Sequence, residues 1–134
     1  MKIDEVEGIG ATNAAKLAEA GVSTADQLLQ WGANPAGRKS LEDTTGISGK
    51  LILDWVNHVD LMRIKGVGSE YSDLLEAAGV DSPSELAQRN AANLATTFAE
   101  VVAARPGLVR RTPSETEVAG WIDEAKGMDK VVEH

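Results

Sequence analysis

The sequence predicts an all-helical protein made of two similar halves, and three observations support this prediction. Apolar residues recur at helical spacing, and no segment alternates apolar and polar residues as a half-buried strand does. Glycines and prolines separate the apolar segments at intervals that are typical of short helices. Finally, two kinds of segment each occur twice along the chain, which indicates an internal duplication.

The first repeated segment is a glycine turn followed by a helix. Residues 6–10 (Val-Glu-Gly-Ile-Gly) recur as residues 64–68 (Ile-Lys-Gly-Val-Gly), 58 positions further on (66 − 8). Glycine suits such a turn because it adopts positive φ and lets another backbone approach closely. After the first copy, the apolar pattern predicts helices over residues 13–20 and 24–31, the first of them ending at Gly21.

The second repeated segment carries matched tryptophans, Trp55 and Trp121, 66 positions apart (121 − 55). In each copy, apolar residues three positions before and one position after the tryptophan share its helix face. Two roles suit these rings, base stacking and core packing, and the large area that a tryptophan buries favours core packing.

The two repeats have offsets that differ by eight residues (66 − 58), which indicates an insertion. Residues 91–104, within the inserted region, are predicted to form a longer helix. Ser82-Pro83 predicts the start of the helix before it.

We expect two units, residues 1–60 and 61–134, that pack as one body because no segment resembles a flexible linker. A chain of 134 residues can bury roughly two thirds of the surface that it exposes when unfolded, which suits either one domain or two small halves. Residues after Gly127 are expected to fray, since chain ends are often poorly ordered.

The composition excludes several classes of site. The chain has no cysteine, so disulfides and thiolate metal sites are absent, and His58 has no second histidine at ligand spacing. No catalytic or nucleotide-binding motif is present, so we expect no enzyme. No apolar run approaches the roughly 18 residues of a membrane span, and the N-terminus lacks the apolar region of a signal peptide. We therefore expect a cytoplasmic protein with no membrane partner.

The glycine turns resemble the helix-hairpin-helix motif. Gly8-Ile9-Gly10 and Gly66-Val67-Gly68 carry the resemblance, each with a leucine seven residues after its second glycine; residues 45–48 are a looser third instance and residues 111–114 a degenerate fourth. Nearly the whole chain is similar to a bacterial family of tandem helix-hairpin-helix proteins that is classed as a domain of unknown function. The resemblance implies the fold, and it implies no established activity.

Helix-hairpin-helix domains commonly bind the nucleic-acid backbone without reading its sequence, and the resemblance implies the same role here. The N–H groups that open the following helix point outward, and the helix dipole adds partial positive charge there. In some members the hairpin carbonyls also hold a monovalent cation that bridges to phosphate; no other cofactor is implied. The candidate DNA- or RNA-binding residues are Gly8, Ile9, Gly10, Lys16, Gly46, Ile47, Lys50, Lys65, Gly66, Gly68, Arg110 and Arg111.

The alternative is a protein-interaction or scaffolding module in which the turns only shape the fold. The net charge of −8 favours it, because phosphate affinity comes mainly from lysine and arginine. Glu70 and Asp73 follow the second turn, where DNA-binding hairpins usually carry basic residues, so that turn is predicted to be the poorer phosphate site. Acidic residues precede the first turn and basic residues the second, which would favour attraction between halves or neighbouring chains. The oligomeric state stays open.

Overall fold

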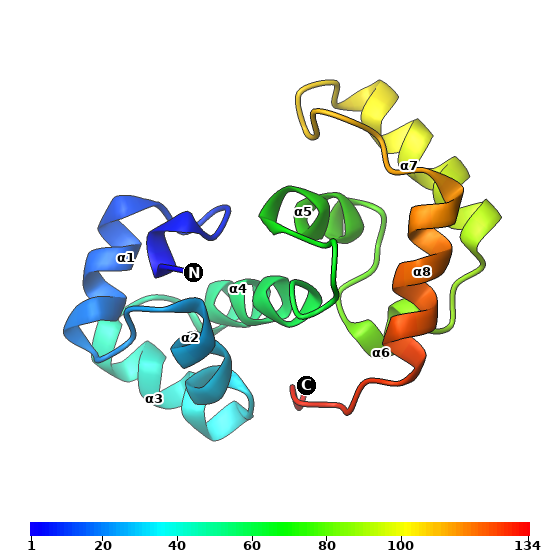
Figure 1. Cartoon of the computed structure of the whole chain (residues 1–134). Helices are drawn as coiled ribbons and strands as arrows, with labels where there is room; N and C mark the ends of the chain where they lie inside the picture. The colour runs from blue at the N-terminus through cyan, green and yellow to red at the C-terminus, as the bar shows by residue number, and fades with distance from the viewer. The chain divides into compact units, whose positions relative to one another are not determined.

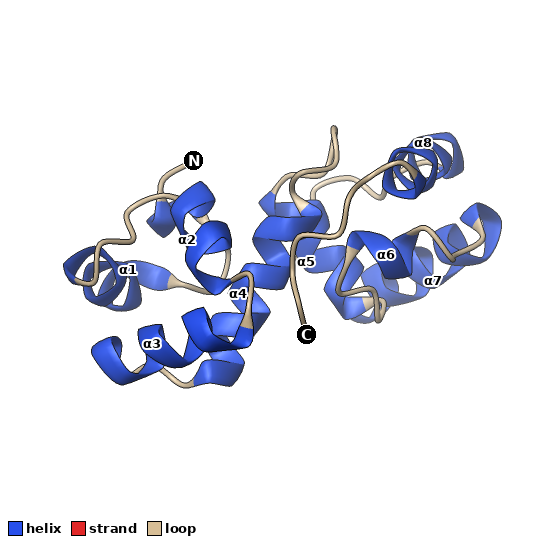
Figure 2. Cartoon of the chain, turned by 90° about the horizontal axis from the view of Figure 1, so that it is seen from below, coloured by secondary structure: helices blue, strands red, loops and turns tan.

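The computed structural model describes all 134 residues, and its regular structure is helical (Figures 1 and 2). In chain order the elements are the 3-10 helix η1 (Ile3–Glu5) and the α-helices α1 (Gly10–Glu19), α2 (Ala25–Gly32), α3 (Pro35–Thr45), α4 (Gly49–Leu61), α5 (Ser69–Ala77), α6 (Pro83–Leu86), α7 (Ala91–Ala104) and α8 (Glu115–Lys126). No strand forms, and the only extended pairing is an isolated bridge between Lys2 and Thr24. The all-helical prediction is confirmed. None of these helices has the length and apolar character that crossing a bilayer requires.

The contacts divide the chain into two compact units. Unit 1 contains Met1–Asp60 together with Val131–His134, and unit 2 contains Leu61–Lys130. The ranges expected from the sequence, 1–60 and 61–134, differ from these units in the last four residues, which belong with unit 1.

In unit 1, α1 packs on η1 and on α3, and α2 also packs on α3. Apolar side chains at helical spacing give these helices a common interior, because each helix buries one face only. The fully buried side chains of this unit are Leu17, Val22, Leu28, Leu41, Ile52 and Val56. The apolar spacing predicts Leu17, Leu28 and Ile52 of this core, whereas Trp31, on the same predicted helix as Leu28, is 44% exposed.

Helix α3 is absent from the prediction, and its composition explains why. Its buried residues are Arg38 and Leu41, so its inward face has no apolar periodicity. The Arg38 guanidinium donates to the carbonyls of Gly32 and Glu133, each at 2.8 Å. Burial lowers the pKa of Arg38, while the carboxylate of Glu133 raises it. An arginine in a sequence normally predicts an exposed position, so the buried face of α3 shows no apolar pattern by which the helix could be recognised.

The C-terminal segment is ordered against unit 1. Val132 is only 1% exposed, and the N–H of Glu133 donates to the carbonyl of Ala33 at 2.7 Å. The expectation that residues after Gly127 fray is therefore wrong for residues 131–134. Their backbone hydrogen bonds and one buried apolar side chain give a short segment enough contact to hold it in place.

In unit 2, α8 packs on α6 and α7, and α5 packs on α7. Two aromatic contacts lie in its core: the ring centroid of Trp121 is 5.3 Å from that of Tyr71 and 6.5 Å from that of Phe98. Both separations fall in the favourable range for tilted aromatic pairs. Trp121 is thus a core residue of unit 2, as the repeat of the tryptophans predicts.

Candidate functional site

Two turns with the same local structure precede α1 and α5. Glycine turn 1 comprises residues 6–10 and glycine turn 2 comprises residues 64–68. In turn 1 the N–H of Ile9 donates to the carbonyl of Val6 at 3.3 Å, and in turn 2 the N–H of Val67 donates to that of Ile64 at 3.0 Å. These four side chains are buried, so each turn is anchored by two apolar residues while the glycine between them is exposed.

The two glycines of each turn have different conformational roles. Gly8 and Gly66 both have positive φ, +86° and +90°, which disfavours a side chain. Gly10 also has positive φ, +73°, whereas Gly68 has φ −91° and ψ −170°, in the extended region that most residues can adopt. The second glycine is therefore required by the backbone in turn 1 and not in turn 2.

The helices that follow these turns lack side-chain caps. The other six α-helices each begin with a side-chain oxygen that accepts from an N–H of the opening residues; these caps are Thr24, Asn34, Ser48, Ser82, Asn90 and Ser114. By contrast, the N-caps of α1 and α5 are Ile9 and Gly68, which provide no such oxygen. Gly10, Ala11 and Thr12, which open α1, are exposed, and no side chain of the N-cap residue binds their N–H groups.

The segment between α3 and α4 is different, because the chain supplies its own acceptors there. The N–H of Gly49 donates to the carboxylate of Glu42, and the N–H of Leu51 donates to Ser48 Oγ at 3.2 Å. A phosphate at this third turn would have to displace Glu42, although Lys50 nearby is exposed. Of the candidates in this turn, Gly46 has positive φ and ends α3, and Ile47 is buried.

The start of α8 is also satisfied internally. Ser114 and Glu117 form a capping box, with each side chain accepting from the other residue's N–H at 3.1 Å. The Arg111 guanidinium donates to both carboxylate oxygens of Glu117, at 2.6 and 2.9 Å. This hydrogen-bonded pair, with the Ser114 N–H, lowers the pKa of Glu117 to about 2 and raises that of Arg111. The guanidinium of Arg111 is thus already paired with the carboxylate of Glu117.

Acidic side chains near turn 2 are bound to neighbouring donors. Glu70 accepts from the backbone N–H of Arg110 and, at 3.2 Å, from its Nε. The backbone N–H is the first cause of the lowered pKa of Glu70, and the guanidinium adds to it. Glu124 accepts from the N–H of Lys65 at 3.0 Å. The Arg110 side chain is 94% exposed and the Lys65 residue is exposed, so two cations remain accessible beside this turn.

The remaining candidates are distributed unevenly. Gly8, Ile9 and Gly10 lie together in turn 1, but Lys16 lies in the last turn of α1, about 9 Å along the helix axis from Gly10. In unit 2, Arg110 and Arg111 come close to the start of α5, since Glu70 binds the first and Tyr71 Oη donates to the carbonyl of the second at 2.9 Å. The contacts of Glu70 and Tyr71 link residues forty positions apart, and that of Glu42 reaches seven residues; no local motif reveals them.

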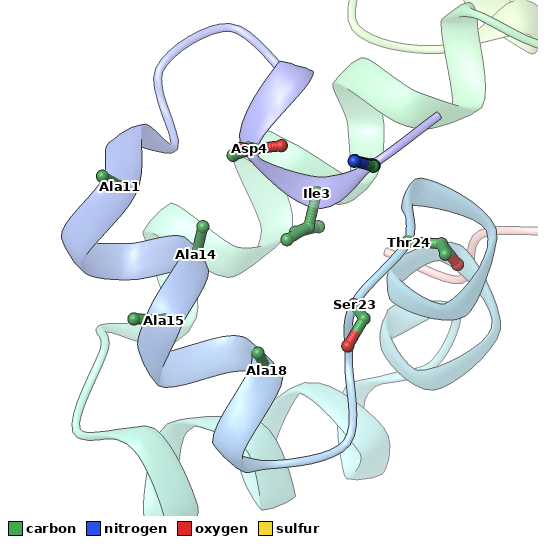
Figure 3. A pocket seen from close by; sticks show the side chains of 9 residues that line it. Ile3, Asp4, Ala11, Ala14, Ala15, Ala18, Ser23 and Thr24 are labelled. Atoms are coloured by element: carbon green, nitrogen blue, oxygen red, sulfur yellow. The ribbon is translucent and has the colours of Figure 1, made fainter.

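A shallow groove of about 520 Å³ follows α1 in unit 1 (Figure 3). Small and apolar side chains form much of its surface. The lining residues are Lys2, Ile3, Asp4, Ala11, Ala14, Ala15, Ala18, Ser23 and Thr24. Because Ala11 is also one of the opening residues of α1, the groove starts beside turn 1.

A family model described as "Domain of unknown function (DUF4332)" matches residues 7–128. The matched segment includes most of turn 1, all of turn 2 and every α-helix. No curated protein and no solved structure matches this chain.

Proposed function

Because the chain belongs to the DUF4332 family, which has no assigned function, we propose a function from the geometry of the two glycine turns. The protein is a non-catalytic module that binds phosphate groups of a nucleic-acid backbone without reading the base sequence. In this proposal the turns are helix-hairpin-helix turns, and the two units are copies of one ancestral pair of helices.

The single observation that carries the proposal is the absence of caps on α1 and α5. A side-chain N-cap stabilises a helix by about 1 kcal/mol. The chain uses such caps on its other six α-helices and omits them at the two that follow glycine turns. Open N–H groups at a helix N-terminus form a binding site for an anion, because the helix dipole adds to their attraction. An external oxyanion would take the place of the missing caps.

The local charges make turn 2 the more favourable of the two for a polyanion, contrary to the expectation from Glu70. Glu70 and Glu124 are bound to backbone donors, while Lys65 and the Arg110 side chain are accessible. Turn 1 contains Glu7 and is preceded by Glu5, and it would attract a phosphate mainly through main-chain N–H groups. The overall charge of −8 then limits affinity without removing the two local sites.

The proposed duplication is supported by features that recur in both units. The same turn hydrogen bond, the same positive φ at the first glycine and the same missing cap occur at turn 1 and turn 2. Each unit also places a tryptophan against that glycine, Trp55 at Gly8 and Trp121 at Gly66. Such agreement in non-adjacent residues favours descent from one repeat over two independent turns.

The test is binding of a labelled DNA duplex across a salt series, followed by fluorescence anisotropy. We expect binding at low salt that weakens as salt rises, because phosphate neutralisation releases counterions. Lys65→Glu should weaken binding, and Lys50→Glu should weaken it less because Glu42 already occupies the neighbouring N–H. Lys39→Glu is the matched control: it changes the net charge equally, but Lys39 lies on α3, paired with Asp43. No binding at low salt, or equal losses in all three variants, would overturn the proposal.

A second candidate function is binding of a partner helix in the groove along α1, since its alanine side chains would allow close approach of another helix. Ala15→Arg separates the two functions, because Ala15 lines the groove and lies outside the glycine turn. For a protein-interaction module this substitution removes partner binding. For a phosphate-binding module it leaves duplex affinity at least as high as in the natural protein.

A further inference from the structure

Each glycine turn has a tryptophan indole N–H beside it. A Cβ built on Gly8 would lie 3.8 Å from Nε1 of Trp55, and one built on Gly66 would lie 3.2 Å from Nε1 of Trp121. Apart from the glycine and its two chain neighbours, the nearest atom in both cases is the indole nitrogen, the only polar atom of that side chain. Since Gly8 and Gly66 have no side chain and are exposed, nothing on these residues covers the N–H.

Neither indole N–H has an acceptor within the chain. The two tryptophans are only 5% and 4% exposed, yet no fully buried polar side-chain atom lacks a hydrogen-bond partner. No hydrogen bond involves either Nε1, so this edge of each ring must reach the surface at the turn. Because so little of either side chain is exposed, neither ring offers a free face for base stacking.

The indole of Trp121 is held in a fixed orientation. Its ring contacts those of Tyr71 and Phe98, and Tyr71 is itself held by a hydrogen bond to the carbonyl of Arg111. A donor that is fixed by packing loses little conformational freedom when it binds a ligand. An indole N–H only donates, so its natural partner is an oxygen of an anion or a carbonyl.

We propose that the indole N–H groups of Trp55 and Trp121 each donate a hydrogen bond to the oxyanion held at the adjacent glycine turn. This inference rests on the proposed function and adds to it. A phosphodiester has two non-bridging oxygens; the opening N–H groups of the helix bind one, and the indole binds the other. All these donors are uncharged, which lets an acidic protein bind a phosphodiester at sites that need few lysines.

The test uses the natural protein labelled with ¹⁵N, whose three tryptophans give three indole N–H signals. A short DNA duplex is titrated in one series and inorganic phosphate in another. We expect the indole signals of Trp55 and Trp121 to shift downfield along the same binding curve as the amide signals of Gly10 and Ser69, the first residues of α1 and α5. Trp31, which is 44% exposed and distant in sequence from both turns, is the internal control and should not follow that curve.

The outcomes separate this inference from the function on which it rests. If the amides of the turns shift while both indoles stay unchanged, the indole role is wrong and the phosphate function stands. If neither shifts with either ligand, both are wrong. A shift with duplex and not with inorganic phosphate supports a backbone ligand that spans more than one site.

A substitution gives the matching affinity measurement. Trp55→Phe and Trp121→Phe keep an aromatic ring and remove the N–H, and each should weaken duplex binding by about threefold to tenfold, the effect of losing one hydrogen bond. Trp31→Phe is the matched control and should leave the affinity unchanged. Circular dichroism establishes that each variant is folded. Equal affinities for all three folded variants would contradict the inference.

Discussion

Replacing each glycine of turn 2 by alanine should have opposite effects on stability. Gly66 has φ +90°, and a Cβ there would lie 3.2 Å from Trp121 Nε1, which is closer than ordinary van der Waals contact. Gly68 has an extended backbone, and a Cβ there would meet no atom within 4 Å. The two positions are two residues apart in one turn, so each substitution is a control for the other.

The size of each stability change follows from the backbone conformation of the glycine and from the contact that its Cβ would make with the indole. A left-handed conformation costs an alanine about 1–2 kcal/mol, and the displacement of the Trp121 indole adds to this for Gly66→Ala. Gly68→Ala should be neutral or stabilise the fold by up to about 1 kcal/mol, because alanine has less freedom than glycine in the unfolded chain. We therefore expect a difference of about 1–3 kcal/mol between the two variants. Gly8→Ala should resemble Gly66→Ala but cost less, since its contact with Trp55 is 3.8 Å.

Thermal and urea unfolding followed by circular dichroism at the helix band measure this difference. For a chain of this size 1 kcal/mol corresponds to about 3–5 °C in Tm. Gly66→Ala should therefore melt several degrees below Gly68→Ala. Equal Tm values for the two variants, or a larger loss for Gly68→Ala, would refute the assignment of the left-handed residue and of the glycine–indole contact.

Two further predictions concern stability. Arg38→Ala should destabilise the protein by about 2 kcal/mol in urea unfolding, because the carbonyls of Gly32 and Glu133 lose a charged donor. Hydrogen exchange should then rise at residues 131–134. Unchanged exchange there would contradict the role of Arg38 in holding this segment. Glu117 has a folded-state pKa of about 2, below its ordinary value of 4.5, so its contribution to stability is complete above pH 4.5 and is lost as the pH falls toward 2. Glu117→Gln should lose less stability over that interval than the natural protein in urea unfolding at several pH values, and parallel losses in the two proteins would count against the Arg111–Glu117 pair.

The fold was largely predictable from local sequence patterns. Apolar spacing predicts α1, α2 and α7, although α1 starts at Gly10 rather than at residue 13, and the glycine pattern locates both turns. Helix α3 was not predicted because its buried face includes Arg38. The Arg38 guanidinium donates to the carbonyl of Gly32, six residues away, and to that of Glu133, 95 residues away. Asn34 followed by Pro35 is the one local signal of its start, an N-cap with proline in the first helical position.

The candidate site was less predictable, because its properties depend on side chains that lie outside the glycine turns and their motifs. Glu70 reads as a repelling charge beside turn 2, but Arg110, forty residues later, binds its carboxylate. Lys50 reads as a phosphate ligand, but Glu42 occupies the neighbouring N–H. Sequence spacing shows which residues open a helix, and it does not show which acceptors reach their N–H groups.

Phosphate binding by the uncapped starts of α1 and α5 is tested most directly by amide shifts in a duplex titration, read at α1, whose opening residues are exposed. We predict that the ¹H–¹⁵N signals of Gly10, Ala11 and Thr12 shift on addition of duplex, while that of Glu117, whose N–H is already bound by Ser114, stays unchanged. Shifts at Glu117 without shifts at the opening residues of α1, or no shifts at saturating duplex, would contradict the account.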